Sequence, residues 1–347
     1  MKVWKGVSWG IILIVSACID PVNLTTGEGG TLVVDGWITD QPGPYTIKLS
    51  RSIAYDNSRP LRVFSVAESD ALVTVVDRFG TVEKFKESTT KGTYVNSETS
   101  TFKGGVGKAY QLTIKTKAGR SYHSAYDSLV PVAPIARLQA KFRVIESLIT
   151  NASGNAVIQK RESFDVSVEV NDPANSQNYY RWQSDGIFEF FSLTDFAALK
   201  QCWAPYLSKI EPMLEIASDD NFDGQTFQKV IGNILYDRTT KFLVKVRQQS
   251  LTPAAYKFLN GLSIQGTSTG TLFDPPPADL KGNMVCDSDP DETVLGFFGC
   301  SSVSAGMYLI DRFKDSGFVN PTHNLLPIPG NCLTQQPGAT NIKPEGF

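Results

Sequence analysis

The sequence has few residues of the kinds that most catalytic and metal sites need. Its 347 residues include two histidines, His123 and His323, and five cysteines. No two cysteines have the C-x-x-C spacing, so structural zinc is not expected. Each histidine is expected to be an ordinary surface or hydrogen-bonded residue. No arrangement of nucleophile, base and orienting residue stands out, and the chain is therefore not expected to be an enzyme.

Runs of positive charge are also missing. The formal net charge is −2, from 33 basic and 35 acidic residues. Nucleic acids and anionic membrane surfaces are bound by clustered Lys and Arg, so neither is an expected electrostatic partner. The 41% of hydrophobic residues and 20% of charged residues are typical of a globular protein with a buried core. The length predicts more than one domain.

The N-terminal segment predicts the compartment. Lys2 and Lys5 precede an apolar run at residues 7–15, which is much shorter than the roughly 20 residues that span a bilayer. The following Val15-Ser16-Ala17-Cys18 resembles the bacterial lipobox, in which small residues precede an acylated cysteine. Residues 1–17 are therefore expected to be a lipoprotein signal peptide, and Cys18 the first residue of the mature chain. Acyl chains such as palmitate on Cys18 would anchor the chain to the membrane without spanning it.

The other four cysteines suit an oxidising compartment. An even number, Cys202, Cys286, Cys300 and Cys332, predicts two disulfides. Three pairings are open from sequence alone. We favour Cys286–Cys300, which closes a short loop, together with Cys202–Cys332, which pins the C-terminal tail to the middle of the chain.

Strand signals dominate the mature chain. A tether at residues 18–30 leads to short alternating segments separated by Gly-bearing turns, which predict an N-terminal β-sandwich domain at 31–131. Prolines at 131–134 mark a boundary because proline disfavours both helix and paired strand. A second β-rich domain with insertions is expected at 135–317, followed by an irregular tail at 318–347. The predicted fold class is mainly all-β, with two Ig-like or fibronectin-like sandwich domains.

The second domain is expected to contain a few special segments. Strands at 179–184 and 242–248 flank a stretch predicted to be irregular, and a further strand at 294–298 is expected to help close this domain. A short helix is predicted to begin with Thr252 as N-cap and Pro253 in the first turn, and to stop at Gly261.

Two motifs resemble functional ones but are incomplete. The spelling Gly266-Thr267-Ser268-Thr269-Gly270 matches the G-x-S-x-G elbow of serine hydrolases, but the strand required before it is missing, so a flexible loop is favoured. Asp219, Asn221 and Asp223, followed by Gly224, resemble the start of a calcium loop. The bidentate glutamate expected later falls on Val230. A solvated turn is therefore favoured, and calcium is kept as the only candidate cofactor.

Two further groups of side chains are candidates for binding sites. Residues 287–292 form a second acidic cluster, interpreted as a surface loop. Aromatic residues are dense in the second domain, where core packing explains most of them and a ligand or partner surface would explain the rest.

Several motifs together resemble one known family. They are LVVDGWIT at 32–39, PGPYTIKLSRS at 42–52, GKAYQLTI at 107–114, YYRW at 179–182, LFDPPP at 272–277, GN at 282–283 and LGFFG at 295–299. With the lipobox, this pattern resembles the Bacteroidetes lipoprotein family called domain of unknown function 4249. The family has no assigned catalytic residues. Its members resemble accessory lipoproteins encoded beside TonB-dependent outer-membrane receptors, so the resemblance implies an outer-membrane location and such a receptor as partner.

The chain departs from that family at two points. Cys300 stands where a small residue is expected, so the Cys286–Cys300 bridge would be peculiar to this chain. Only Asp20 follows Cys18, where surface export signals usually have several acids. The surface-exposed and the periplasmic face of the outer membrane therefore both stay open.

The function expected from these observations is a non-catalytic, lipid-anchored accessory protein that captures or helps to take up a ligand with a TonB-dependent receptor. The alternative is a structural or assembly scaffold of the cell envelope. The ligand is not identified by the sequence. A partner surface is predicted on the acidic loop 287–292 and on a stiff Pro-rich segment, because rigid loops lose little entropy on docking. That segment consists of Phe273, Asp274, Pro275, Pro276 and Pro277.

Overall fold

The fold is mainly β, as predicted, and has three sheets and few helices. In this computed structural model the described residues are 30–52, 65–151, 153–193, 199–206, 210, 214–267 and 280–347. Within these ranges, none of the helices combines the length and the apolar character needed to cross a membrane. Cys18 and the Pro-rich segment 273–277 lie outside the described residues.

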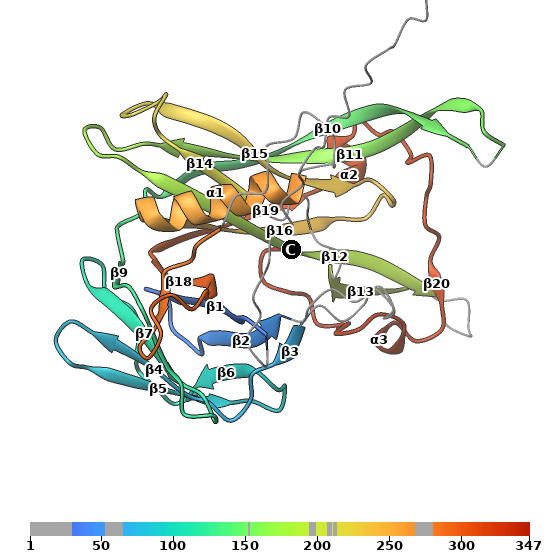
Figure 1. Cartoon of the computed structure of the whole chain (residues 1–347). Coiled ribbons are helices and arrows are strands. Elements are labelled where there is room, and N and C mark those ends of the chain that lie inside the picture. Colours follow the sequence, from blue (N-terminus) through green and yellow to red (C-terminus); the bar gives the residue numbers. More distant parts are fainter. Residues whose placement is uncertain are drawn as a thin grey trace, which may run out of the picture.

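The first sheet, sheet A, forms the lower part of Figure 1 and curls around its own core. Its hydrogen-bonded path runs β17-β8-β7-β4-β5-β6-β2-β1-β18, with β3 beside β2 and β9 beside β7. The two ends of this path, β17 and β18, also contact each other. The strands are β1 (Leu32–Thr39), β2 (Thr46–Ser52), β3 (Ser65–Ala67), β4 (Leu72–Asp77), β5 (Val82–Glu87), β6 (Thr93–Asn96), β7 (Ala109–Lys115), β8 (Ser121–Ser124), β9 (Asp127–Ser128), β17 (Met284–Cys286) and β18 (Leu295–Ser301).

Strands β17 and β18 join sheet A although they come from the C-terminal half of the chain. The sequence predicts a strand at 294–298 within the second domain. In the structure this strand is β18, which instead pairs in parallel with β1 of sheet A, with Trp37 opposite Gly299. Strand β17 pairs with β8. Most of β18 is buried, so it needs cover on both faces, which the core of sheet A and a helix provide. Such a parallel pair requires a long crossover that local sequence patterns do not reveal.

Sheets B and C pack face to face around a second core rich in aromatic residues. Tyr180, Trp182, Phe188 and Phe190 belong to this core, in agreement with the interpretation that most aromatic residues in this region serve packing. Sheet B contains β10 (Ile135–Thr150), β11 (Ala156–Asn171) and β15 (Thr226–Leu235). Sheet C contains β12 (Tyr179–Leu193), β13 (Leu199–Pro205), β14 (Glu215–Ser218), β16 (Phe242–Ser250), β19 (Val303–Ile310) and β20 (Ile328–Pro329).

The stretch between β12 and β16 is more regular than predicted. It contains β13, β14 and β15, of which β13 and β14 pair with β12 and β15 pairs with β11. The apolar residues of β15 lie at positions 227, 230, 231, 234 and 235, so its sequence has no clear period of two. Tertiary pairing with longer neighbours determines these strands more than their own pattern does.

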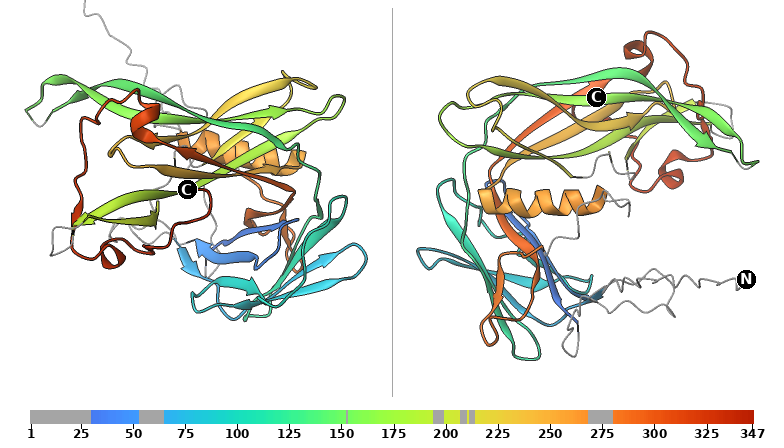
Figure 2. Two further views of the ribbon diagram at one scale, coloured as in Figure 1. Left: turned by 180° about the vertical axis from the view of Figure 1, so that it is seen from behind. Right: turned by 45° about the horizontal axis from the view of Figure 1, so that its top comes forward.

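Helix α1 (Pro253–Thr267) lies across the junction between sheet A and sheets B and C (Figure 2, right). Thr252 is its N-cap, as predicted: the hydroxyl accepts a hydrogen bond from the Ala255 amide at 3.3 Å. The predicted stop at Gly261 is wrong, since α1 continues through it. A Cβ at Gly261 would lie 2.3 Å from Leu280 Cδ2, so this glycine allows Leu280 to pack closely against the helix.

The C-terminal tail is held at several points despite having little regular structure. It includes α3 (Cys332–Gln335), and α2 (Arg312–Asp315) precedes it. Cys202 and Cys332 form a disulfide with a Cα–Cα distance of 6.4 Å, in the predicted pairing. Thr340 bridges the backbone of Trp203, and the Phe347 ring lies 6.0 Å from the Trp203 ring.

Candidate functional site

The outer face of β1 forms the floor of a cleft at the junction of the sheets. Residues alternate along a strand, so Leu32, Val34 and Ile38 enter the core of sheet A while Asp35 and Trp37 face the other way. The neighbouring β18 has Gly299 opposite Trp37. A Cβ at Gly299 would lie 2.4 Å from the Trp37 ring. Only glycine therefore lets the indole lie flat on this strand.

Helix α1 forms a second wall over this floor. The Phe258 ring stacks on Phe297 of β18 with a centroid distance of 5.2 Å. Trp37 stacks on the same Phe297 at 6.1 Å. Leu259 of the helix is buried in this cluster. The three rings and the helix side chains give the cleft a rigid, apolar lining.

Strand β12 contributes a cation to the cleft. Tyr180 and Trp182 point into the core between sheets B and C, so Arg181 between them points out of that core, toward α1. Its guanidinium carbon lies 5.0 Å from the centroid of the Trp37 ring, within cation–π range. Burial lowers the pKa of Arg181, an effect opposed by the nearby Asp35 carboxylate.

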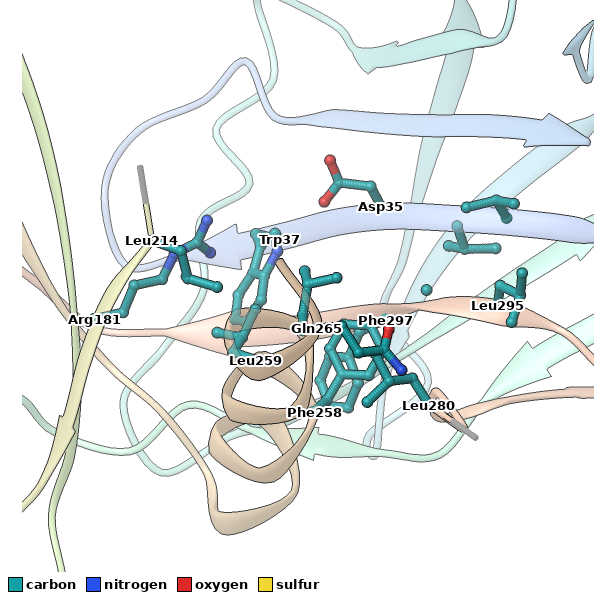
Figure 3. Close-up of a pocket in the computed structure, with 14 residues that line it drawn as sticks. Asp35, Trp37, Arg181, Leu214, Phe258, Leu259, Gln265, Leu280, Leu295 and Phe297 are labelled. Atoms are coloured by element: carbon teal, nitrogen blue, oxygen red, sulfur yellow. The ribbon is translucent and has the colours of Figure 1, made fainter. Parts of the chain in front are cut away.

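Together these elements enclose a cavity of about 510 Å³, here called the α1 cleft. Figure 3 shows Arg181 and Trp37 at one end and Leu280 and Leu295 at the other. This volume lies in the range of small-molecule sites. The side chains and backbone that line it belong to Val33, Val34, Asp35, Trp37, Arg181, Leu214, Phe258, Leu259, Leu262, Gln265, Leu280, Leu295, Gly296 and Phe297.

The sequence did not identify this cleft. Trp37 and Arg181 appeared only inside the motifs LVVDGWIT and YYRW. The one local signal was an arginine alternating with buried aromatic residues on β12. That signal places Arg181 on the outer face of sheet C, but it does not reveal what covers that face.

The two remaining cysteines do not form the predicted second disulfide. Cys286 and Cys300 are free and buried. They lie on β17 and β18, which pair with β8 and β1 rather than with each other, and both side chains belong to the core of sheet A. Burial and the nearby Asp127 raise the pKa of the Cys300 thiol well above its usual value. These cysteines serve as small core residues.

The calcium-like loop brings together a different set from the predicted one. Asp219 and Asp223 lie near Asp172, which directly follows β11, with a carboxylate oxygen of each within 4.8 Å of the others. Asn221, the third predicted ligand, is exposed. Asp219 accepts a hydrogen bond from the Asn178 amide at 2.7 Å, and Asp172 accepts one from the Gly224 amide at 3.1 Å. The sequence missed Asp172 because three strands, β12, β13 and β14, separate it from the loop.

The acidic loop 287–292 is partly used within the fold. Asp287 pairs with His123. Glu292 accepts hydrogen bonds from Arg120 at 2.7 Å and from the Tyr122 hydroxyl at 3.0 Å. These contacts attach the loop to β8, so half of the predicted acidic partner surface has a structural role.

The first two residues of the G-x-S-x-G spelling lie in helix α1. Gly266 and Thr267 are the last residues of α1, so a helix precedes the motif where an elbow needs a strand. The two positions are helical rather than part of the flexible loop that the sequence favoured. Residues 268–270 lie outside the described ranges.

Comparison with known proteins adds one finding. A search of curated proteins gave no match. The family model for the domain of unknown function DUF4249 matches residues 19–306, which include every lining residue of the α1 cleft. The chain belongs to the DUF4249 family.

Proposed function

We propose that this chain is a lipid-anchored binding protein of the outer membrane, which holds a small, largely apolar ligand in the α1 cleft. In this proposal it works beside a TonB-dependent receptor in ligand capture or uptake and catalyses no reaction. The observation that carries the proposal is the α1 cleft itself, a cavity of about 510 Å³ lined mainly by aromatic and aliphatic side chains.

The position of the cleft supports a binding role. One wall comes from sheet A and the other from α1 and β12, so residues far apart in the chain converge on it. Junctions of this kind are common places for ligand sites. The lipobox-like sequence before Cys18 supports the membrane anchor, and the family resemblance supports the receptor partner.

A neutral fluorescent hydrophobe, N-phenylnaphthylamine, tests whether the cleft takes an apolar ligand. The full chain carrying Cys18→Ser needs no detergent because it lacks the lipid. We expect it to bind the probe, and Leu262→Trp to weaken binding about tenfold, because the larger side chain fills the space. Leu72→Trp, at a site that is 70% exposed on sheet A, is the matched control. Equal binding by the Leu262→Trp variant would contradict the proposed site.

A pull-down tests the receptor. The tagged lipoprotein is isolated from its native outer membrane in mild detergent, and co-purifying proteins are identified by mass spectrometry. We expect a TonB-dependent receptor in stoichiometric amount. Recovery of the chain alone, or with assembly machinery only, would contradict this part of the proposal.

One observation favours the alternative role as an envelope scaffold. The distal half of the β10–β11 hairpin is exposed (Figure 1). There Leu148 lies opposite Ile158, and the two residues are 75% and 64% exposed. Replacement of both by serine separates the roles: a scaffold would lose its co-purifying proteins, whereas binding of N-phenylnaphthylamine would be unchanged.

A further inference from the structure

None of the described residues gives the Arg181 guanidinium a carboxylate partner in the α1 cleft. Within these residues it makes no hydrogen bond and no ion pair, and its guanidinium carbon lies 5.0 Å from the centroid of the Trp37 ring. Asp35 lines the same cleft but is not within ion-pair distance. Arg181 is therefore a largely buried cation that only a ring face and a more distant carboxylate stabilise.

Two other arginines show the usual arrangement. Arg247, on the neighbouring strand β16, pairs with Asp185 at 3.0 Å. The buried Arg312 pairs with Asp237 at 3.0 Å and donates to Thr240. Buried charges are normally paired in this way, because an unpaired one loses its hydration without compensation. Arg181 departs from that rule at the point where the protein has a cavity.

The neighbour of Arg181 on the sheet does not supply the missing acceptor. Gln249 lies directly opposite Arg181 on β16, and its side-chain oxygen is buried without a hydrogen bond among the described residues. The guanidinium does not hydrogen-bond that oxygen, and Figure 3 shows it beside Trp37. Its donors face the cleft.

The rest of the cleft defines the body and the charge of a ligand. Phe258, Phe297, Leu280 and Leu295 present an apolar surface beyond Trp37. Among the described residues Asp35 is the one acidic side chain in the lining, and it disfavours a second negative charge on the ligand.

We propose that the α1 cleft binds a singly charged anionic amphiphile, whose acid group accepts hydrogen bonds from Arg181 and whose apolar body packs against Phe258 and Phe297. This inference rests on the proposed function, that the cleft holds a ligand, and it names the ligand's chemical class. A guanidinium recognises a planar carboxylate through paired hydrogen bonds. The ligand would supply the partner that Arg181 does not find among the described residues.

Displacement of N-phenylnaphthylamine from the full chain carrying Cys18→Ser tests the charge preference. The competitors are dodecanoate, dodecanol, dodecylamine and dodecyl phosphate, which share one apolar tail. We expect dodecanoate to bind about 10- to 100-fold more tightly than dodecanol, the effect of charge-assisted hydrogen bonds. Dodecylamine should bind more weakly than dodecanol, and dodecyl phosphate, with its second charge near pH 7, more weakly than dodecanoate.

Variants assign the preference to Arg181. Arg181→Gln should lose the preference for dodecanoate, measured as the ratio of the dodecanoate and dodecanol affinities of the same variant, while Arg181→Lys should keep part of it. Arg247→Gln is the matched control, because this arginine lies on the same sheet but outside the cleft, and it should keep the full preference. A urea unfolding curve like that of the unmodified chain shows that the Arg181→Gln variant is folded.

The outcomes separate the two proposals. Equal affinity for dodecanoate and dodecanol in the unmodified cleft would overturn the inference and leave the proposed function standing. Tighter binding of dodecyl phosphate than of dodecanoate would contradict the proposal that the ligand carries a single negative charge. Failure of the neutral probe and of dodecanol to bind would instead overturn the proposed function.

Discussion

The Asp127 carboxylate accepts a hydrogen bond from the Thr252 hydroxyl at 2.6 Å. Its other oxygen accepts one from the Cys300 amide at 2.7 Å. A single carboxylate thus joins β9, the start of α1 and β18. Burial raises the pKa of Asp127, although both hydrogen bonds oppose the shift. The helix wall of the α1 cleft is fixed to sheet A at this point.

Thr252→Val is expected to destabilise the protein by about 2 kcal/mol, because it removes the N-cap of α1 and one donor to a buried carboxylate. Thr252→Ser keeps the hydroxyl and should cost much less. Urea unfolding of both variants measures the difference. Since α1 is a wall of the cleft, N-phenylnaphthylamine should also bind the valine variant more weakly. A valine variant as stable as the serine variant would show that the contact to Asp127 contributes little.

Glu87 gives a pH dependence of stability. Hydrogen bonds from the backbone, led by that of Gly92 at 2.8 Å, lower the pKa of Glu87 to about 2. A lowered pKa stabilises the folded state above the usual glutamate pKa of about 4.3, and this contribution disappears as the pH falls from there toward about 2.

Glu87→Gln should therefore reduce stability at pH 6 to 7, and the difference from the unmodified chain should shrink below about pH 4.3. Denaturant midpoints measured for both chains across this pH range check the effect. Glu98→Gln, at an exposed turn position, controls for the simple loss of a surface charge. A difference that stays constant down to pH 3 would contradict the assigned hydrogen bonds.

The free cysteines give a prediction that is tested by counting the alkylated thiols. In denaturant without reductant, the chain carrying Cys18→Ser should take up alkylating reagent at Cys286 and Cys300 and nowhere else. After reduction, Cys202 and Cys332 should react as well. In the folded state Cys286 and Cys300 should be protected, because both side chains are buried. Absence of any alkylation before reduction would contradict the free thiols and support the predicted Cys286–Cys300 disulfide.

Local sequence patterns predicted the features that depend on neighbouring residues. Alternation predicted the mainly-β fold, and the Thr252-Pro253 pair predicted the start of α1. The parallel pairing of β18 with β1 was not predicted, because it joins segments from opposite ends of the chain. The helix end was also missed, since Gly261 makes room for Leu280, a contact that lies outside the helix's own sequence.

The candidate site was harder to predict than the fold, for the same reason. Trp37 and Arg181 are ordinary residues of two separate strands until sheet packing brings them together. The carboxylate group at the calcium-like loop was only partly predicted, because the spacing identified Asp219 and Asp223 but not Asp172. A site assembled from distant strands leaves no fixed spacing in the sequence.

The acidic group of Asp172, Asp219 and Asp223 tests the remaining sequence interpretation, that of a solvated turn. Three carboxylates this close repel one another. In EDTA, the exposed Asp223→Asn should therefore raise the melting temperature by an amount on the order of 1 °C. Asp291→Asn, which removes the same charge from another exposed loop position, is the control and should have a smaller effect.

Calcium distinguishes the solvated turn from the calcium loop in the same melts. For a solvated turn, millimolar Ca²⁺ leaves both the unmodified chain and Asp223→Asn unchanged. For a cation site, Ca²⁺ raises the melting temperature of the unmodified chain, because a ligand that binds only the folded state stabilises it, and Asp223→Asn removes that rise. Because the glutamate ligand of a complete loop is replaced by Val230, and the third carboxylate comes from the residue after β11, we expect no shift.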